Sequence, residues 1–139
     1  MDHQQLVDIF ITGQEVTVPV EEVSRFYQCL IRTLDAMGNA VVSKPANPLA
    51  LAYMLHKIAR EYILRRTNYA DAEQALRVSL RILAYLAADD AEIQAESYRL
   101  LAILFTLHRR FDNAQLCDAK AVALAMGLEL SDDAFRKNQ

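Results

Sequence analysis

The chain has 139 residues, of which 53% are hydrophobic and 24% charged, and its formal net charge is -3. This composition excludes an intrinsically disordered chain, and the length suffices for one domain with its own core, so no metal or disulfide framework is required. The few glycines and prolines, three of each, favour helices over a fold of many short strands. Residues 1–46 hold six acidic and three basic side chains and residues 47–139 hold twelve of each, so the basic excess typical of nucleic-acid binders is missing.

The N-terminal part, residues 1–46, is predicted to contain two helices. A short helix spans Asp2–Thr12, capped by Asp2 and ended by Gly13, and residues 14–18 form a connector. From Pro19 to Met37 the apolar side chains fall on one stripe with helical spacing, which predicts a second helix that Gly38 stops.

A linker follows this second helix. The stretch "NAVVSKPANP", residues 39–48, contains two prolines three residues apart, which excludes a regular element there. The helix Pro19–Met37 is expected to supply a packing layer for the helices beyond the linker.

Four further helices are predicted in residues 47–127. Their starts are marked by capping or first-turn residues: Asn47 before Pro48, Asn68 with an acid three residues later, the acidic "AADDAE", and Asp112. The predicted spans are Asn47–Arg66, Asn68–Ala87, Ala91–Leu107 and Asp112–Met126, the last ended by Gly127. In the C-terminal segment 128–139, Ser131–Asp133 can start a last short helix.

A pattern recurs in these helices. "RRTNYADA" and "RRFDNA" each place an aromatic residue three positions before an alanine, Tyr69 with Ala72 and Phe111 with Ala114. The arginine pairs stand at different distances from these alanines, which indicates that the aromatic and the alanine are the repeated element. The preceding helices also match, since Leu55, Ile58, Ala59 and Tyr62 have the spacing of Tyr98, Leu101, Ala102 and Phe105.

These residues resemble the tetratricopeptide repeat, a helix-turn-helix unit with large, small and aromatic residues at set positions. The resemblance covers residues 52–127, with a period of about 42 residues in place of 34. It implies an all-α fold of antiparallel hairpins stacked as a short superhelix of about six helices, within a single domain.

The resemblance also implies a groove, lined by the first helix of each repeat, that takes a peptide or an amphipathic helix of another protein. The alternative is that its apolar members are core, packed against the N-terminal helices or a second copy of the chain. The corresponding residues are Tyr53, His56, Arg60, Ile63, Leu64, Glu96, Arg99, Ile103, Thr106 and Leu107.

Enzymatic activity is not expected. His3, His56 and His108 have no metal-ligand spacing, and the isolated glycines form no phosphate-binding loop, so no cofactor or metal is predicted. His56 is a groove residue or an ordinary solvated histidine. Cys29 and Cys117 are predicted to be reduced, buried thiols, and the alternative is a disulfide or a reactive thiol.

Two more predictions concern apolar residues of the helix Pro19–Met37 and the paired arginines. Phe26, Tyr27 and Leu30 are core residues or a dimer face. The arginine pairs at 65–66 and 109–110 stabilise the ends of the preceding helices or form a patch for an acidic partner.

We therefore predict a protein-binding module, similar in size and charge to the small tetratricopeptide chaperones of bacterial type III secretion. The alternative is a regulatory or structural subunit of a larger complex, or a homodimer. Neither nucleic acid nor a membrane is an expected partner. Without a signal peptide or a membrane span in the sequence, a cytoplasmic location is expected.

Overall fold

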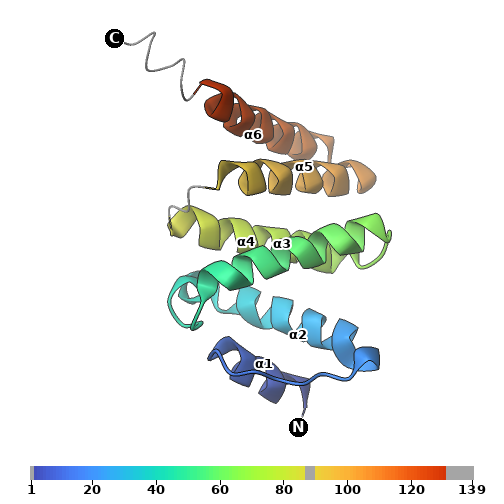
Figure 1. Cartoon of the computed structure of the whole chain (residues 1–139). Helices are drawn as coiled ribbons and strands as arrows, with labels where there is room; N and C mark the ends of the chain where they lie inside the picture. Colours follow the sequence, from blue (N-terminus) through green and yellow to red (C-terminus); the bar gives the residue numbers. More distant parts are fainter. Residues whose placement is uncertain (1, 87–89, 131–139) are drawn as a thin grey trace. The chain divides into compact units, whose positions relative to one another are not determined.

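The computed structural model describes residues 2–86 and 90–130, and within them the regular elements are helical, as predicted (Figure 1). The chain divides into two compact units, residues 1–88 and 89–139, so the boundary falls between the two predicted helix pairs. The first unit holds α1–α4 and the second holds α5 and α6. The α-helices are α1 (His3–Ile11), α2 (Val23–Ala36), α3 (Pro48–Leu64), α4 (Tyr69–Tyr85), α5 (Ala91–Leu107) and α6 (Phe111–Leu130), and the 3-10 helices are η1 (Val20–Glu22) and η2 (Gly38–Val42).

Helix α1 begins as the sequence predicts. The carboxylate of Asp2 accepts a hydrogen bond from the Gln5 amide at 2.8 Å, while the Gln5 side chain accepts one from the Asp2 amide at 2.9 Å. This reciprocal pair satisfies two amides that the first turn leaves without helical partners. Phe10 packs edge-to-face on Phe26 at 5.7 Å between ring centroids, which attaches α1 to α2.

The second predicted helix starts later than expected. Pro19 has an extended ψ of 143°, one 3-10 turn follows, and α2 begins only at Val23. The helix ends at Ala36, and Gly38 takes the left-handed φ of 58° that suits a stop signal. Phe26 and Leu30 are buried and belong to the core, whereas Tyr27 is half-buried.

The predicted absence of regular structure in residues 39–48 is wrong for the first half of that stretch. Residues 38–42 form the 3-10 helix η2, and its Val41 is fully buried. The two prolines lie beyond η2, so they remove no amide that this turn needs.

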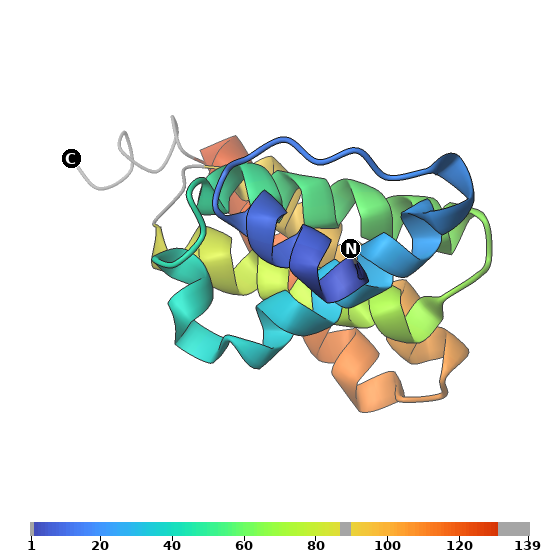
Figure 2. The same ribbon diagram turned by 90° about the horizontal axis from the view of Figure 1, so that it is seen from below.

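The start of the connector before α2 lies beside the beginning of α3 (Figure 2). Gln14 and Glu15 share a small, mainly apolar cavity of about 240 Å³ with Ala50 and Met54 of α3. Residues 14 and 15 therefore lie against the beginning of a helix, and the segment 14–19 is irregular instead of forming a strand.

Helices α3 and α4 form an antiparallel pair. Asn47 caps α3 as predicted, because its side chain accepts a hydrogen bond from the Ala50 amide at 3.1 Å and Pro48 occupies the first turn. Ala59 and Ala72, the small residues of the repeat, are fully buried. The buried Ser79 hydroxyl of α4 donates to the Ala52 carbonyl of α3 at 2.7 Å, which fixes the two helices in one register.

Helix α2 packs against α4 and adds a layer to this pair. Asp35 of α2 accepts a hydrogen bond from Gln74 at 3.0 Å and lies 3.7 Å from the Arg81 guanidinium. The Arg32 guanidinium lies 3.8 Å from the largely buried Asp71 carboxylate. Polar contacts, in addition to apolar burial, thus set how α2 crosses α4.

Helices α5 and α6 form the second pair. Helix α5 spans the predicted residues, and Ala102 and Ala114 are 4% and 5% exposed. The predicted stop at Gly127 is wrong, since α6 continues to Leu130. Gly127 has no positive φ, and one glycine inside a helix costs only about 1 kcal/mol relative to alanine.

The helix proposed to start at Ser131–Asp133 lies outside the described residues. In the described part of the chain, no helix combines the length and the apolar character needed to cross a membrane.

Candidate protein-binding surfaces

The two hairpins share one turn geometry. The Thr67 amide donates to the Tyr62 carbonyl at 3.0 Å, and the Arg110 amide donates to the Phe105 carbonyl at 2.7 Å. In each case the residue just before the donor has a left-handed backbone: φ is 56° at Arg66 and 58° at Arg109. These are the bonds of a Schellman helix end.

One arginine of each pair is therefore part of the structural repeat, whereas the sequence pattern excludes both pairs from it. Arg66 and Arg109 occupy equivalent positions 43 residues apart. The first turn then has one residue more than the second before its next helix begins. That extra residue shifts Tyr69 and Ala72 relative to the arginines and hides the match.

Asn68 does not cap α4 in the way that the sequence predicts. Asn68 precedes α4, but its backbone is left-handed, with φ of 52°, and its side chain makes no capping hydrogen bond. An N-cap residue normally has an extended backbone that turns its side chain onto the first amides. Asn68 instead tolerates a left-handed bend that few residue types adopt readily.

The predicted stripe on α3 is only partly accessible. Arg60 and Leu64 are exposed, Leu64 by 68%, whereas Tyr53 and Ile63 are half-buried. His56 is 4% exposed, so it is neither a groove residue nor a solvated histidine. It continues the buried face of α3, on which Ala52, Leu55, His56 and Ala59 lie at positions i, i+3, i+4 and i+7.

The predicted stripe on α5 is open. Arg99, Thr106, Ile103 and Leu107 are exposed, the last two by 47% and 54%, and Glu96 is half-buried. Thr106 donates its hydroxyl to the Ala102 carbonyl at 2.8 Å, so it presents mainly its methyl group. Arg99, Ile103 and Leu107 are spaced at i, i+4 and i+8 and thus lie on one face.

The arginine pairs have local partners. The Arg65 Nε lies 2.7 Å from a Glu61 carboxylate oxygen one turn earlier, and the Arg110 guanidinium lies 4.6 Å from the centre of the Phe105 ring. Both contacts are with the helix that the arginine follows, which fits the role in helix ends.

A pocket of about 560 Å³ lies at the start of α2, beside Tyr62 of α3. The Tyr62 hydroxyl is buried without a hydrogen-bond partner. The side chains of Ser24 and Asn68 nevertheless lie close enough to lower its pKa. Burial, followed by the negative charge of Asp71, raises the pKa of Tyr62 above 10.0. The hydroxyl therefore stays protonated at neutral pH.

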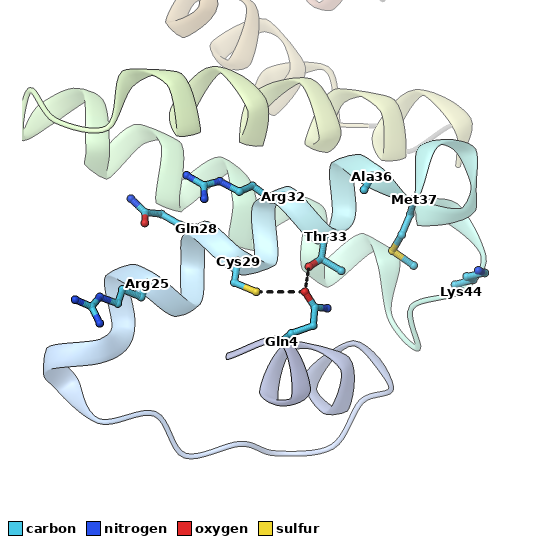
Figure 3. Close-up of a pocket in the computed structure, with 9 residues that line it drawn as sticks. All are labelled: Gln4, Arg25, Gln28, Cys29, Arg32, Thr33, Ala36, Met37 and Lys44. Carbon is cyan, nitrogen blue, oxygen red and sulfur yellow. Dashed lines mark hydrogen bonds between the residues drawn. The ribbon is translucent and has the colours of Figure 1, made fainter. Parts of the chain in front are cut away.

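A second surface, which the sequence analysis does not predict, runs along α2 (Figure 3). We name it the α2 groove, and its volume is about 810 Å³. Its signal in the sequence is the polar face of the predicted helix Pro19–Met37, where Arg25, Gln28 and Arg32 recur at helical spacing. Its lining residues are Gln4, Arg25, Gln28, Cys29, Arg32, Thr33, Ala36, Met37 and Lys44.

The histidine and cysteine side chains of the described residues do not gather in one site. In the described residues no three His, Cys, Asp or Glu side chains are placed to hold a metal ion. A ring nitrogen of His108 contacts the Leu104 carbonyl at 2.8 Å, and His3 lies 3.9 Å from Glu22. Both cysteines are free thiols; Cys117 is buried as predicted, whereas Cys29 is only half-buried and lines the α2 groove.

Comparisons with protein-family models, with curated proteins and with solved structures found no match to this chain. Any function assigned to the surfaces above therefore rests on their own geometry.

Proposed function

We propose that this chain is a tetratricopeptide-like module that binds a peptide or an amphipathic helix of another protein and carries out no chemistry itself. The observation that carries the proposal is the open stripe on α5, where Ile103 and Leu107 are about half exposed next to Arg99. Exposed aliphatic side chains beside a fixed charge suit an amphipathic partner, because the apolar groups supply affinity and the charge sets register.

The exposed residues of α3 support the same proposal. Leu64 occupies the position of Leu107 in the other helix pair, 43 residues earlier, and it too is exposed. A leucine left in solvent at the same place in both pairs stabilises neither pair internally, and contact with a partner would bury it.

The test uses variants of the α5 stripe. Tagged chain is incubated with lysate of the source organism, the captured protein is identified by mass spectrometry, and its binding segment is measured as a synthetic peptide by calorimetry. Ile103→Asp and Arg99→Glu should each weaken binding at least about tenfold, an effect of roughly 1.4 kcal/mol, with unchanged helicity. Leu116→Asp, a matched change on exposed α6, is the control and should bind normally.

Two results would contradict the groove. If Ile103→Asp unfolds the chain, Ile103 is core. If both stripe variants bind like the unaltered chain, the α5 face is not the binding surface. A chaperone role, by analogy with type III secretion, needs its own assay because fold alone does not fix function. The chain should then suppress light scattering by its isolated partner at equimolar concentration.

A second candidate function, a subunit held by a permanent interface, has its own supporting observation. Leu116, Val122 and Met126 of α6 are each at least half exposed, and contact with another chain would bury them. In that case Leu116→Asp should abolish self-association in sedimentation velocity, while Ile103→Asp should leave it intact.

A further inference from the structure

We propose that the α2 groove binds an acidic peptide segment, in a site separate from the stripes of α3 and α5 and independent of their role. The groove lies within the first unit, and its α2 residues recur at spacings of three and four from Arg25 to Ala36. They form the face of α2 that turns away from its buried residues Leu30 and Leu34.

The groove is positively charged, whereas the part of the chain that forms it is acidic. Residues 1–46 carry six acidic side chains and only three basic ones, Arg25, Arg32 and Lys44, and all three basic residues line this groove. No carboxylate is among the lining residues. A positive surface in an acidic part of the chain attracts carboxylates and repels other cations.

The basic side chains of the groove are available to a ligand. Arg25 and Lys44 are exposed, and neither pairs with a carboxylate among the residues that the structure describes. Arg32 is 66% exposed and stands 3.8 Å from Asp71, a distance that leaves room for a second carboxylate. Figure 3 places Arg25 and Lys44 toward opposite ends of the groove, with Arg32 between them along α2.

The floor of the groove is fixed. The side-chain oxygen Oε1 of Gln4 accepts a hydrogen bond from the Cys29 thiol at 3.6 Å and one from the Thr33 hydroxyl at 3.3 Å, as Figure 3 shows. The side-chain nitrogen Nε2 of Gln4 in turn donates a hydrogen bond to the Asp8 carboxylate at 2.9 Å. These bonds hold α1 against α2, so the walls do not have to be ordered when a ligand binds.

The dimensions set the length of the ligand. The α2 backbone rises about 16 Å between Arg25 and Ala36, which an extended chain spans with about five residues. Arg25 and Arg32 are separated by about 10 Å along the helix, or about three residues of an extended chain. We infer a segment with acidic residues three positions apart. Three basic side chains are among the lining residues, whereas proteins that bind nucleic acid tightly contact several phosphates, on the order of six to ten, so an acidic peptide is the favoured occupant.

The test uses the Cys29 thiol as a reporter inside the groove. The full chain is alkylated with iodoacetamide, an uncharged reagent, and modification of the peptide that carries Cys29 is followed by mass spectrometry. The probe is the heptapeptide Ala-Glu-Glu-Ala-Glu-Glu-Ala with blocked ends, whose carboxylates are three residues apart. It should slow the alkylation of Cys29, and the same peptide with Gln in place of Glu should not.

Charge variants then locate the contact. Arg25→Glu and Lys44→Glu should each raise the peptide concentration for half-protection about tenfold, Arg25→Gln by less, and Lys57→Glu, at an exposed position of α3, should leave it unchanged. Protection should also weaken in high salt.

Three results would overturn the proposal: equal protection by the Gln peptide, protection that survives both charge reversals, or protection by heptathymidylate at lower concentration than the acidic peptide. The last of these would assign the groove to nucleic acid.

Discussion

Tyr62→Phe isolates the cost of one buried hydroxyl. The oxygen is inaccessible and has no hydrogen-bond partner, while the rest of the side chain packs in the core of the first unit. A buried polar group without a partner costs about 1 to 3 kcal/mol, and phenylalanine retains the ring. We expect the variant to raise the free energy of unfolding by about 1 kcal/mol, or the melting temperature by about 3 to 5 °C for a chain of this length.

The assay is urea unfolding followed by circular dichroism at pH 7.5, with Tyr85→Phe as the matched control. Tyr85 is 71% exposed, so its hydroxyl is hydrated in the folded chain and its loss should change the free energy by less than about 0.5 kcal/mol. Destabilisation by Tyr62→Phe would refute the reasoning, because it would mean that Ser24 or Asn68 accepts or donates a hydrogen bond in solution.

The stability difference between Tyr62→Phe and the unaltered chain should depend on pH. Since the pKa of Tyr62 in the folded chain is raised above 10.0, both states keep the proton below pH 10. As the pH rises from 10 toward the folded-state pKa, the unfolded chain loses its proton first, and this tyrosine's contribution to stability is lost. The stability advantage of Tyr62→Phe over the unaltered chain should therefore be larger at pH 11 than at pH 8, with the increase concentrated above pH 10.

Three further predictions concern packing and backbone. Ala102→Leu should cost about 1 to 3 kcal/mol in urea unfolding by overpacking a position that is 4% exposed, and an unchanged midpoint would mean that the α5–α6 contact is loose. Gly127→Ala should stabilise α6 by about 0.5 to 1 kcal/mol, since among the described residues nothing beyond the local helix backbone lies within 4 Å of the added methyl group, whereas a loss would place a helix end at Gly127. Arg109→Gly should stabilise the turn by about 1 kcal/mol because φ is 58°, while Arg110→Gly should not; equal effects would argue against the left-handed residue.

Local signals in the sequence located most helices. The cap at Asn47 and the acidic stretch before Ala91 gave the starts of α3 and α5 to within a residue, because capping and first-turn chemistry depend on neighbours in the sequence. The failures at Pro19 and Gly127 have a common cause. Each residue type permits a boundary without requiring one, and the surrounding packing decides whether it is used.

Burial on the candidate stripe was less predictable. His56 and Arg99 occupy equivalent positions in the two repeats, yet one is buried and the other exposed. Periodicity fixes the face of a helix on which a residue lies, but not what covers that face. In the first unit other parts of the chain cover most of α3, and this depends on contacts between residues far apart in the sequence.

The α2 groove was missed because charge was summed along the chain. A total of six acids and three bases in residues 1–46 describes the segment as acidic. Folding separates these charges, because a helix gathers Arg25 and Arg32 on one face and the turn after η2 brings Lys44 to the same groove. The potential that a partner encounters depends on this local arrangement and decays within about 8 Å in physiological salt. A chain with a net negative charge can thus present a positive site, and Lys57→Glu and Arg25→Glu, which change the net charge equally, should differ in their effect on an acidic peptide for this reason alone.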